Sequence, residues 1–166
     1  MTLTLLDYFN AGMKKTVMEF ISAPDGPQVN LGAGSQQLPG VDNLDRSTGW
    51  KAPLLPYGDE SVAAIYAFHF MEHLEGDVAI AQLREIERVL MYQGIFVSVT
   101  PHWSCELAHQ DLDHKSFWSE TTWANLFGNP HYRDRQDGAW QLELHSCVIL
   151  GVASRNLAIV SQLVKI

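Results

Sequence analysis

One short stretch near the amino end of the chain restricts the possible folds more than any other part. The apolar residues Val29 and Leu31 lead directly into Gly32 and Gly34. A second apolar pair, Val41 and Leu44, ends at the carboxylate of Asp45. Glycine allows the sharp backbone bend that a tight connection between two strands requires. The pattern therefore predicts two short strands joined by a glycine turn, with an acidic residue directly after the second strand.

The glycine turn also limits what can bind against it. Because glycine has no Cβ, a ligand can lie close to the backbone, although a Gly-x-Gly pair is also found in ordinary tight turns. In doubly wound α/β folds, an acidic residue in the position of Asp45 binds ribose hydroxyls. A dinucleotide fingerprint requires a third glycine where this chain has Gln37, with Pro39 soon after. The turn therefore favours a ligand that carries a ribose and no pyrophosphate.

Four short motifs follow one another from the glycine turn onward. Asn-Leu-Gly-Ala-Gly occupies residues 30–34, followed by Pro-Gly and Asn-Leu-Asp, and Leu-Pro-Tyr-Gly-Asp-Glu-Ser-Val occupies 55–62. Phe-Met-Glu-His-Leu occupies 70–74, and Arg-Val-Leu-Met-Tyr-Gln-Gly occupies 88–94. Together they resemble the class I S-adenosylmethionine-dependent methyltransferases, in particular the small branch with the motifs LNLGxG, NxD, LPFxDxS, LEHL and RVLKPGG. The resemblance covers residues 28–101.

This resemblance implies an α/β fold, namely a Rossmann-like, mostly parallel sheet with helices on both faces and a C-terminal antiparallel hairpin. It implies S-adenosyl-L-methionine as the cofactor, S-adenosyl-L-homocysteine as the product, and methyl transfer to an oxygen or nitrogen atom of a small or mid-sized acceptor. Residues 32–34 would lie beside the methionine part, Asp45 would bind the ribose, and residues 46 and 53–55 would flank adenine. The implied cofactor-binding residues are Asn30, Gly32, Ala33, Gly34, Asp45, Arg46, Pro53, Leu54, Leu55 and His69.

Three features depart from the family pattern. Asn30 stands where many members have an acid, no adenine-contacting acid is visible in residues 49–53, and Ile95 replaces a second glycine after Gly94. Adenine would then be held by backbone groups and apolar side chains. These departures favour the alternative that the chain is a non-catalytic binding or partner protein with the same fold.

Chain length, net charge and cysteine content restrict the expected domain organisation, binding partners and cellular compartment. A chain of 166 residues is the size of one domain, spanning 1–166, and can bury roughly two-thirds of its unfolded surface. The formal net charge of −8 argues against binding to a phosphate backbone, so we expect a small-molecule or glycan-like acceptor rather than nucleic acid. Cys105 and Cys147 are too few for a disulfide framework and favour a reducing, cytoplasmic setting. We expect no signal peptide and no membrane span; a homo-oligomer stays open.

Hydrophobic periodicity predicts the remaining elements. Nine residues separate Leu31 from Val41, too few for an ordinary crossover helix, so the first crossovers must be shortened. Two prolines within 50–57 allow a short edge strand at most. We expect an amphipathic helix over 3–22, a buried strand over 63–70, a helix over 77–91 followed by a left-handed Gly94, a strand over 95–100, and antiparallel strands over 140–150 and 157–166.

The segment 102–139 follows the strand predicted over 95–100 and is the expected substrate side of the sheet. Within it, Ser119 is expected to cap a short helix that ends at Phe127. At least two of the four tryptophans in the second half of the chain are expected in the core; these are Trp103, Trp118, Trp123 and Trp140.

Three histidines are candidates for a general base. Methyl transfer from a sulfonium depends mainly on positioning, and a histidine whose pKa is near neutrality can remove the proton of the acceptor. His69 at the end of the strand predicted over 63–70 is the first candidate, followed by His114 and His102.

A metal-assisted route is the alternative for the same region. His69, Glu72 and His73 form a His-x-x-Glu-His array, which resembles the Glu-x-x-Glu-His metal site of ubiquinone-biosynthesis O-methyltransferases and small-RNA 2′-O-methyltransferases. A divalent ion there would lower the pKa of an acceptor hydroxyl, with His102 or His114 completing the ligand shell. Glu-His-Leu is also common in members without a metal, and a zinc-protease motif would need both histidines on one helix. The prediction for the site therefore includes no metal, and the alternative stays open.

Overall fold

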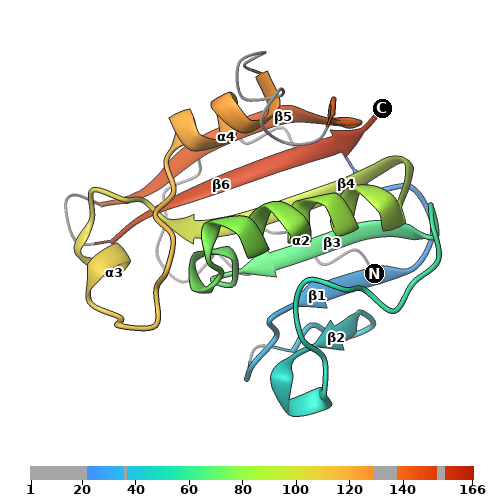
Figure 1. Cartoon of the computed structure of the whole chain (residues 1–166), viewed down its shortest axis with the longest axis horizontal. Helices are drawn as coiled ribbons and strands as arrows, with labels where there is room; N and C mark the ends of the chain where they lie inside the picture. Colours follow the sequence, from blue (N-terminus) through green and yellow to red (C-terminus); the bar gives the residue numbers. More distant parts are fainter. Residues whose placement is uncertain (1–21, 36, 129–137, 153–155) are drawn as a thin grey trace.

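The computed structural model describes residues 22–35, 37–128, 138–152 and 156–166. Within them, one six-stranded sheet has the strand order β2-β1-β3-β4-β6-β5 (Figure 1). The strands are β1 (Gln28–Leu31), β2 (Asp42–Leu44), β3 (Val62–Phe68), β4 (Leu90–Pro101), β5 (Leu142–Val152) and β6 (Asn156–Lys165). The first four pair in parallel, and β6 pairs antiparallel with both β4 and β5. The predicted Rossmann-like, mostly parallel sheet with a C-terminal antiparallel hairpin is confirmed.

The first half of the sheet is reduced, as the short spacings predict. The described residues between β1 and β2, 32–35 and 37–41, contain no helix. A single turn of 3-10 helix, η1 (Arg46–Thr48), follows β2, and residues 50–57 form no strand. β2 is therefore the edge strand on this side of the sheet.

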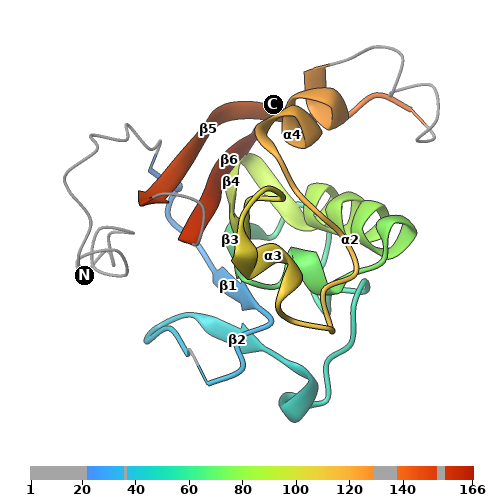
Figure 2. The same ribbon diagram turned by 90° about the vertical axis from the view of Figure 1, so that its left-hand side faces the viewer.

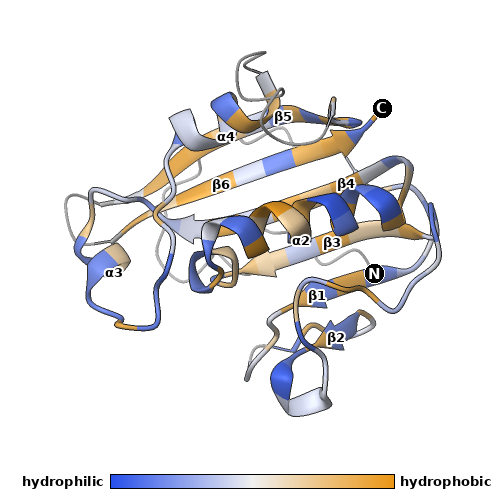
Figure 3. Ribbon diagram, viewed as in Figure 1, coloured by the Kyte–Doolittle hydropathy of each residue, from blue (hydrophilic) through white to orange (hydrophobic). Residues whose placement is uncertain are grey.

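Two helices of the described residues pack on the same face of the sheet, α2 (Gly76–Val89) and α4 (Glu120–Gly128) (Figures 1 and 2). Figure 3 shows apolar and polar residues alternating along α2, and its buried residues are Ala79, Gln82, Leu83, Ile86 and Val89. Burying a Leu, Ile or Val side chain stabilises the fold by about 1.5–3 kcal/mol. The shorter helices are η2 (Met71–His73) and α3 (Glu106–His109). None of the described helices is long and apolar enough to cross a membrane.

The helix expected over 3–22 lies outside the described residues, apart from Ser22. Among the described residues, the predicted helices are seen on the face of the sheet that carries α2 and α4.

The junction of α2 and β4 differs from the prediction. α2 ends at Val89, and β4 begins directly after it rather than at residue 95. Gly94 is not left-handed; the left-handed residue is Gln93, with a φ of 60°. Glycine is required at 94 for a different reason, because a Cβ there would lie 2.8 Å from the carbonyl oxygen of Met91 and 3.2 Å from that of Val62.

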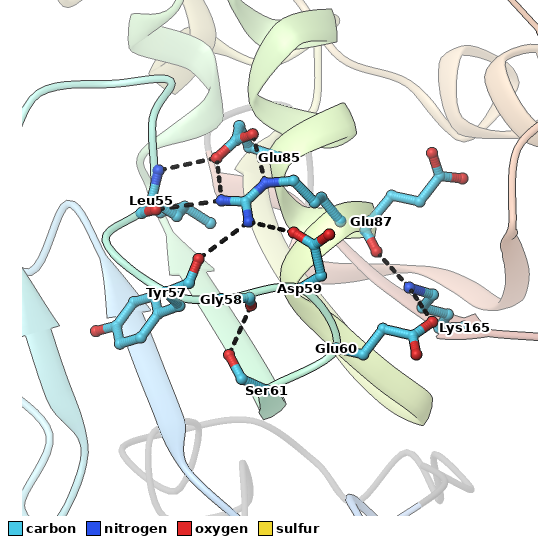
Figure 4. Close-up of polar contacts among 10 residues, drawn as sticks. Leu55, Tyr57, Gly58, Asp59, Glu60, Ser61, Glu85, Glu87 and Lys165 are labelled. Atoms are coloured by element: carbon cyan, nitrogen blue, oxygen red, sulfur yellow. Dashed lines mark hydrogen bonds and ion pairs between the residues drawn. The ribbon is translucent and has the colours of Figure 1, made fainter.

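Arg88, in the last turn of α2, connects the loop before β3 to that helix. Its partners Leu55, Tyr57, Asp59 and Glu85 are labelled in Figure 4. Its Nη1 donates to the Tyr57 carbonyl at 3.0 Å and to the Asp59 carboxylate at 2.7 Å, and its Nη2 donates to the Leu55 carbonyl at 3.3 Å. The Glu85 carboxylate accepts from Nε and Nη2 of Arg88, and from the Leu55 N–H at 3.0 Å. These bonds, chiefly those from Arg88, lower the pKa of Glu85. Two of the four sequence motifs are thus joined to each other in space.

The C-terminal half follows the predicted plan with shifts of one or two residues. Ser119 caps α4: its Oγ accepts from the Thr122 N–H at 3.0 Å, and the Thr122 Oγ1 accepts from the Ser119 N–H at 3.1 Å. Three of the four tryptophans are buried, namely Trp118, Trp123 and Trp140, as expected for core residues. Trp103 is 54% exposed.

Candidate functional site

The chain changes direction across the sheet at β1. It continues from β1 to β2 on one side and then returns to β3 on the other. In open α/β sheets, such a switch point leaves a crevice at the carboxyl ends of the strands, where ligands bind. A cleft of about 200 Å³ lies there and is lined by Asn30, Gly32, Ala33, Gly34, Ser35, Phe68 and His69. The predicted cofactor-binding set includes all of these residues except Ser35 and Phe68.

Two glycines shape the floor of the cleft. Gly32 and Gly34 have left-handed backbones, with φ of 66° and 49°, which only glycine adopts at little cost. At Gly32 a Cβ would also lie 2.4 Å from Cδ2 of Phe70, whereas the nearest atom to a Cβ at Gly34 is 4.0 Å away. Gly32 is therefore fixed by packing against the Phe70 ring, and Gly34 by backbone conformation alone.

Asp45 lies beside the glycine turn. Its Oδ2 accepts from the Gly34 N–H at 3.2 Å, and its Oδ1 accepts from the Ser47 N–H at 2.9 Å as the N-cap of η1. These backbone bonds, that of Ser47 first, lower the pKa of Asp45, so the carboxylate is ionised at neutral pH. A carboxylate has about four acceptor positions, and the two oxygens of this half-exposed side chain keep lone pairs for further donors.

Asn30 lines the cleft but is tied to the second strand. Its Nδ2 donates to the Oδ1 of Asn43 at 3.0 Å. The Asn43 side chain in turn bonds both the N–H and the carbonyl of Leu38, each at 2.9 Å. This network holds the loop between β1 and β2 in place without a crossover helix.

The four residues predicted to flank adenine differ in how deeply they are buried. Arg46 is exposed, Pro53 is half-buried, and Leu54 is 72% exposed. Leu55 is buried in the core, and both of its backbone groups are bonded to α2. These four residues do not line the cleft.

One aromatic pair near this segment was not part of the predicted set. The rings of Trp50 and Phe70 lie 5.6 Å apart, and the Trp50 Nε1 donates to the Leu54 carbonyl at 2.7 Å. The signal in the sequence is weak, because neither aromatic residue belongs to a periodic pattern. Their contact depends on how the loop after η1 folds back toward η2.

His69 combines a strained backbone with a buried carboxylate partner. It follows the last residue of β3 with a φ of 52°, and such left-handed non-glycine residues are concentrated at functional sites. Its Nδ1 lies 3.2 Å from Oε1 of Glu72, which is 2% exposed. In the tautomer that carries its proton on Nδ1, this nitrogen donates to the Glu72 oxygen and Nε2 keeps a lone pair that can take up a proton. An imidazole oriented in this way by a carboxylate has the geometry of a general base.

The other two candidate histidines do not line the cleft. The ring of His102 is engaged at both nitrogens, with Ser104 Oγ at 2.7 Å and Glu120 Oε2 at 3.1 Å. His114 lies next to His73, with ring centroids 4.9 Å apart. Of the three histidines, only His69 lines the cleft.

No protein-family model and no curated protein sequence matches this chain. Its fold, however, is that of solved S-adenosylmethionine-dependent methyltransferases. One such enzyme from Methanosarcina mazei has a TM-score of 0.60 at 13% identity, over 86% of this chain and 93% of that chain. Another, from Thermotoga maritima, has a TM-score of 0.55 at 16% identity, over 86% and 84%. Geranyl diphosphate C-methyltransferase from Streptomyces coelicolor, solved with S-adenosyl-L-homocysteine, has a TM-score of 0.58 at 12% identity, over 87% and 75%. At this level of identity the likeness shows a shared fold.

Proposed function

We propose that this protein binds S-adenosylmethionine in the cleft at the carboxyl ends of β1 and β3 and transfers its methyl group to an oxygen or nitrogen atom of a small or mid-sized acceptor. The observation that carries the proposal is the hydrogen bond between the Gly34 N–H and the Asp45 carboxylate. It places an ionised, half-exposed acceptor of hydrogen bonds beside a cleft lined by glycine. A ribose with two neighbouring hydroxyls matches the free lone pairs of Asp45, and the glycine turn leaves room for the methionine part.

The reaction needs few groups of the protein. When bound, S-adenosylmethionine would supply the methyl group: an acceptor atom would attack the methyl carbon in line while its bond to the sulfonium sulfur breaks, which would leave an uncharged sulfur in S-adenosyl-L-homocysteine. Holding the reacting atoms about 3–3.5 Å apart supplies much of the acceleration. The proton of the acceptor passes to Nε2 of His69, and the Glu72 carboxylate stabilises the imidazolium that forms.

The cofactor part of the proposal is tested by calorimetry with S-adenosylmethionine and S-adenosyl-L-homocysteine. Asp45→Asn keeps a side-chain oxygen for the N-cap of η1 and removes the charge. Hydrogen bonds to a charged group contribute about 1.5–3 kcal/mol, so the variant is expected to bind roughly 10- to 150-fold more weakly. Asp25→Asn changes an exposed acid outside the cleft and is the matched control. Absence of binding by the wild type, or equal binding by Asp45→Asn, contradicts the proposal.

The catalytic part is tested by transfer of a labelled methyl group to a panel of hydroxyl and amine acceptors. His69→Gln is expected to reduce the rate of transfer, measured at saturating cofactor, about 10²- to 10⁴-fold. His109→Gln alters a histidine that stacks on Phe117 outside the cleft and serves as the control. An unchanged rate for His69→Gln refutes its role as the base.

A non-catalytic binding protein is the second candidate. It is favoured by Asn30, because an uncharged amide bonded to Asn43 stands where the resembling family often has an acid. Tight binding of S-adenosyl-L-homocysteine together with no transfer to any acceptor in the panel would favour this candidate over the enzyme.

A further inference from the structure

A serine, a histidine and a glutamate form a chain of hydrogen bonds just beyond the carboxyl end of β4. His102 follows the last residue of that strand, Ser104 lies two residues further on, and Glu120 is the first residue of α4. Nδ1 of His102 lies 2.7 Å from Oγ of Ser104, and Nε2 of the same ring lies 3.1 Å from Oε2 of Glu120. A hydroxyl within hydrogen-bond reach of a base that a third group orients is the arrangement of an activated nucleophile.

The backbone of Ser104 indicates which nitrogen of the His102 ring can act as a base. The N–H of Ser104 donates to Nδ1 at 3.3 Å. The tautomer that accepts this bond has its lone pair on Nδ1 and its proton on Nε2, from which it donates to the Glu120 carboxylate. In this tautomer Nδ1 can take up the proton of the serine hydroxyl, and Glu120 stabilises the imidazolium that forms.

The surrounding fold holds the base in place and leaves the serine accessible. The N–H of His102 donates to the Leu157 carbonyl of β6 at 2.9 Å, and the N–H of Trp103 donates to the Trp118 carbonyl at 2.8 Å. His102 is 8% exposed, whereas Ser104 is an exposed residue. A shielded imidazole therefore lies directly beneath a hydroxyl that a molecule in solution can reach.

We propose that Ser104, His102 and Glu120 form a second reactive site, which hydrolyses small carboxylic esters through an acyl-serine intermediate. Oγ of Ser104 attacks the carbonyl carbon of the ester, and its proton passes to Nδ1 of His102. That proton then goes to the departing alcohol as the bond between carbon and the alcohol oxygen breaks. Water attacks the acyl-serine, Nδ1 takes one of its protons and returns it to Oγ, and the carboxylic acid leaves. The reaction consumes only the ester and water.

Trp103 and the charges around the serine indicate the kind of ester. The Trp103 ring centroid lies 6.1 Å from that of His102, and the residue is 54% exposed. An indole offers a flat apolar surface to an aromatic or alkyl group. Glu106 and Glu120 are exposed carboxylates close to Ser104 in the chain or in space, and like charges repel. The site therefore favours an uncharged ester with an aromatic or alkyl acyl group.

The competing explanation is a purely structural role. In that case the three side chains only connect the start of α4 to the end of β4, and Ser104 is no more reactive than any other exposed serine. The two explanations therefore differ in the reactivity of the Ser104 hydroxyl.

The experiment uses the full chain without S-adenosylmethionine, so its outcome is independent of the proposed methyl transfer. Hydrolysis of p-nitrophenyl acetate and p-nitrophenyl butyrate is followed by absorbance. In parallel, the protein is treated with a fluorophosphonate reagent, and the modified residue is identified by peptide mass spectrometry. We expect hydrolysis above the rate in buffer, faster for the butyrate, and labelling at Ser104.

Ser104→Ala is expected to abolish the labelling and to reduce the catalysed rate about 10²- to 10⁴-fold, the usual contribution of a general base. Ser22→Ala changes an exposed serine far from the group in the sequence and is the matched control, expected to react as the wild type does. Circular dichroism of each variant separates loss of the nucleophile from loss of fold, and labelling of the wild type decides if Ser104→Ala does not fold.

Glu120 acts through His102 and is a positioning residue. Glu120→Gln is therefore expected to lower kcat about tenfold or more and to leave KM unchanged, because the charge-assisted bond is lost while the ester surface stays intact. Glu120→Asp should recover part of the loss. Labelling at no serine or only at another serine, equal hydrolysis by Ser104→Ala and the wild type, or an unchanged kcat for Glu120→Gln overturns the proposal.

Discussion

Gly32→Ala is expected to destabilise the protein more than the same substitution at Gly34. Both glycines have a left-handed backbone, which costs an alanine about 1–2 kcal/mol. Only at Gly32 would the new Cβ also overlap a neighbour, at 2.4 Å from Cδ2 of Phe70, and overpacking typically costs about 1–3 kcal/mol. The expected loss is therefore about 2–5 kcal/mol at Gly32 and about 1–2 kcal/mol at Gly34.

The measurement is urea unfolding followed by circular dichroism, with the free energy taken from the midpoint at a constant slope. A double-mutant cycle with Phe70→Ala tests the steric part. Removal of the ring takes away the contacts at 2.4 and 2.8 Å and leaves the backbone cost together with a milder overlap of the two Cβ atoms at 2.9 Å, so the loss at Gly32 should become smaller. Gly40→Ala is the control: Gly40 has a φ of 75° and no atom within 4 Å of a Cβ, so it should match Gly34. Equal losses at Gly32 and Gly34, or a loss at Gly32 that does not change without the Phe70 ring, would refute this reasoning.

Three further predictions concern the rest of the fold. Bonds from Arg88 lower the pKa of Glu85 below its ordinary value of 4.5, so the contribution of this carboxylate to stability is present above that value and is lost as the pH falls through the folded-state pKa. The stability difference between wild type and Glu85→Gln should therefore shrink from about pH 7 to about pH 3, and a constant difference would contradict this prediction. Burial raises the pKa of Cys147 to about 11, so its alkylation at about pH 8 should be roughly a hundredfold slower than that of an unperturbed thiol; rapid labelling of the native protein would show that the thiol is not shielded. Ser119→Ala should cost about 1 kcal/mol through loss of the N-cap, against a smaller effect for Thr121→Ala in the exposed first turn of α4, as judged by thermal unfolding.

The sequence predicts those parts of the fold that depend on local pattern. The apolar run before Phe68 and the stripe that includes Leu83 are properties of single elements, so β3 and α2 follow from periodicity. The mostly parallel sheet with its C-terminal antiparallel hairpin follows from the resemblance of the motifs. The ring of Phe70 above Gly32 does not follow from the sequence, because their contact joins the ends of two different strands.

Gly94 shows a second reason why sequence reasoning fails. A glycine shortly after a helix usually marks a left-handed cap, but here the neighbouring Gln93 has that conformation, and Gly94 is needed where β4 passes close to β3. Within the site, the approach of His114 to Glu72 depends on a loop without periodicity, fixed by backbone bonds across more than forty residues. Such contacts between distant segments carry no local signal in one sequence.

The two edge strands of the sheet differ in how readily they could pair with a strand of another chain. The edge strand β2 has three residues, whereas the opposite edge strand, β5, has eleven. A long border strand is a template for strand addition unless a bulge, a charge or a covering segment interrupts it. In β5 the pairing with β6 shifts between Leu144 and Ser146, with exposed Glu143 and His145 at that irregularity. Pairing of sheets between two copies of this protein would therefore involve β5, and the register shift between Leu144 and Ser146 is the feature that opposes such pairing.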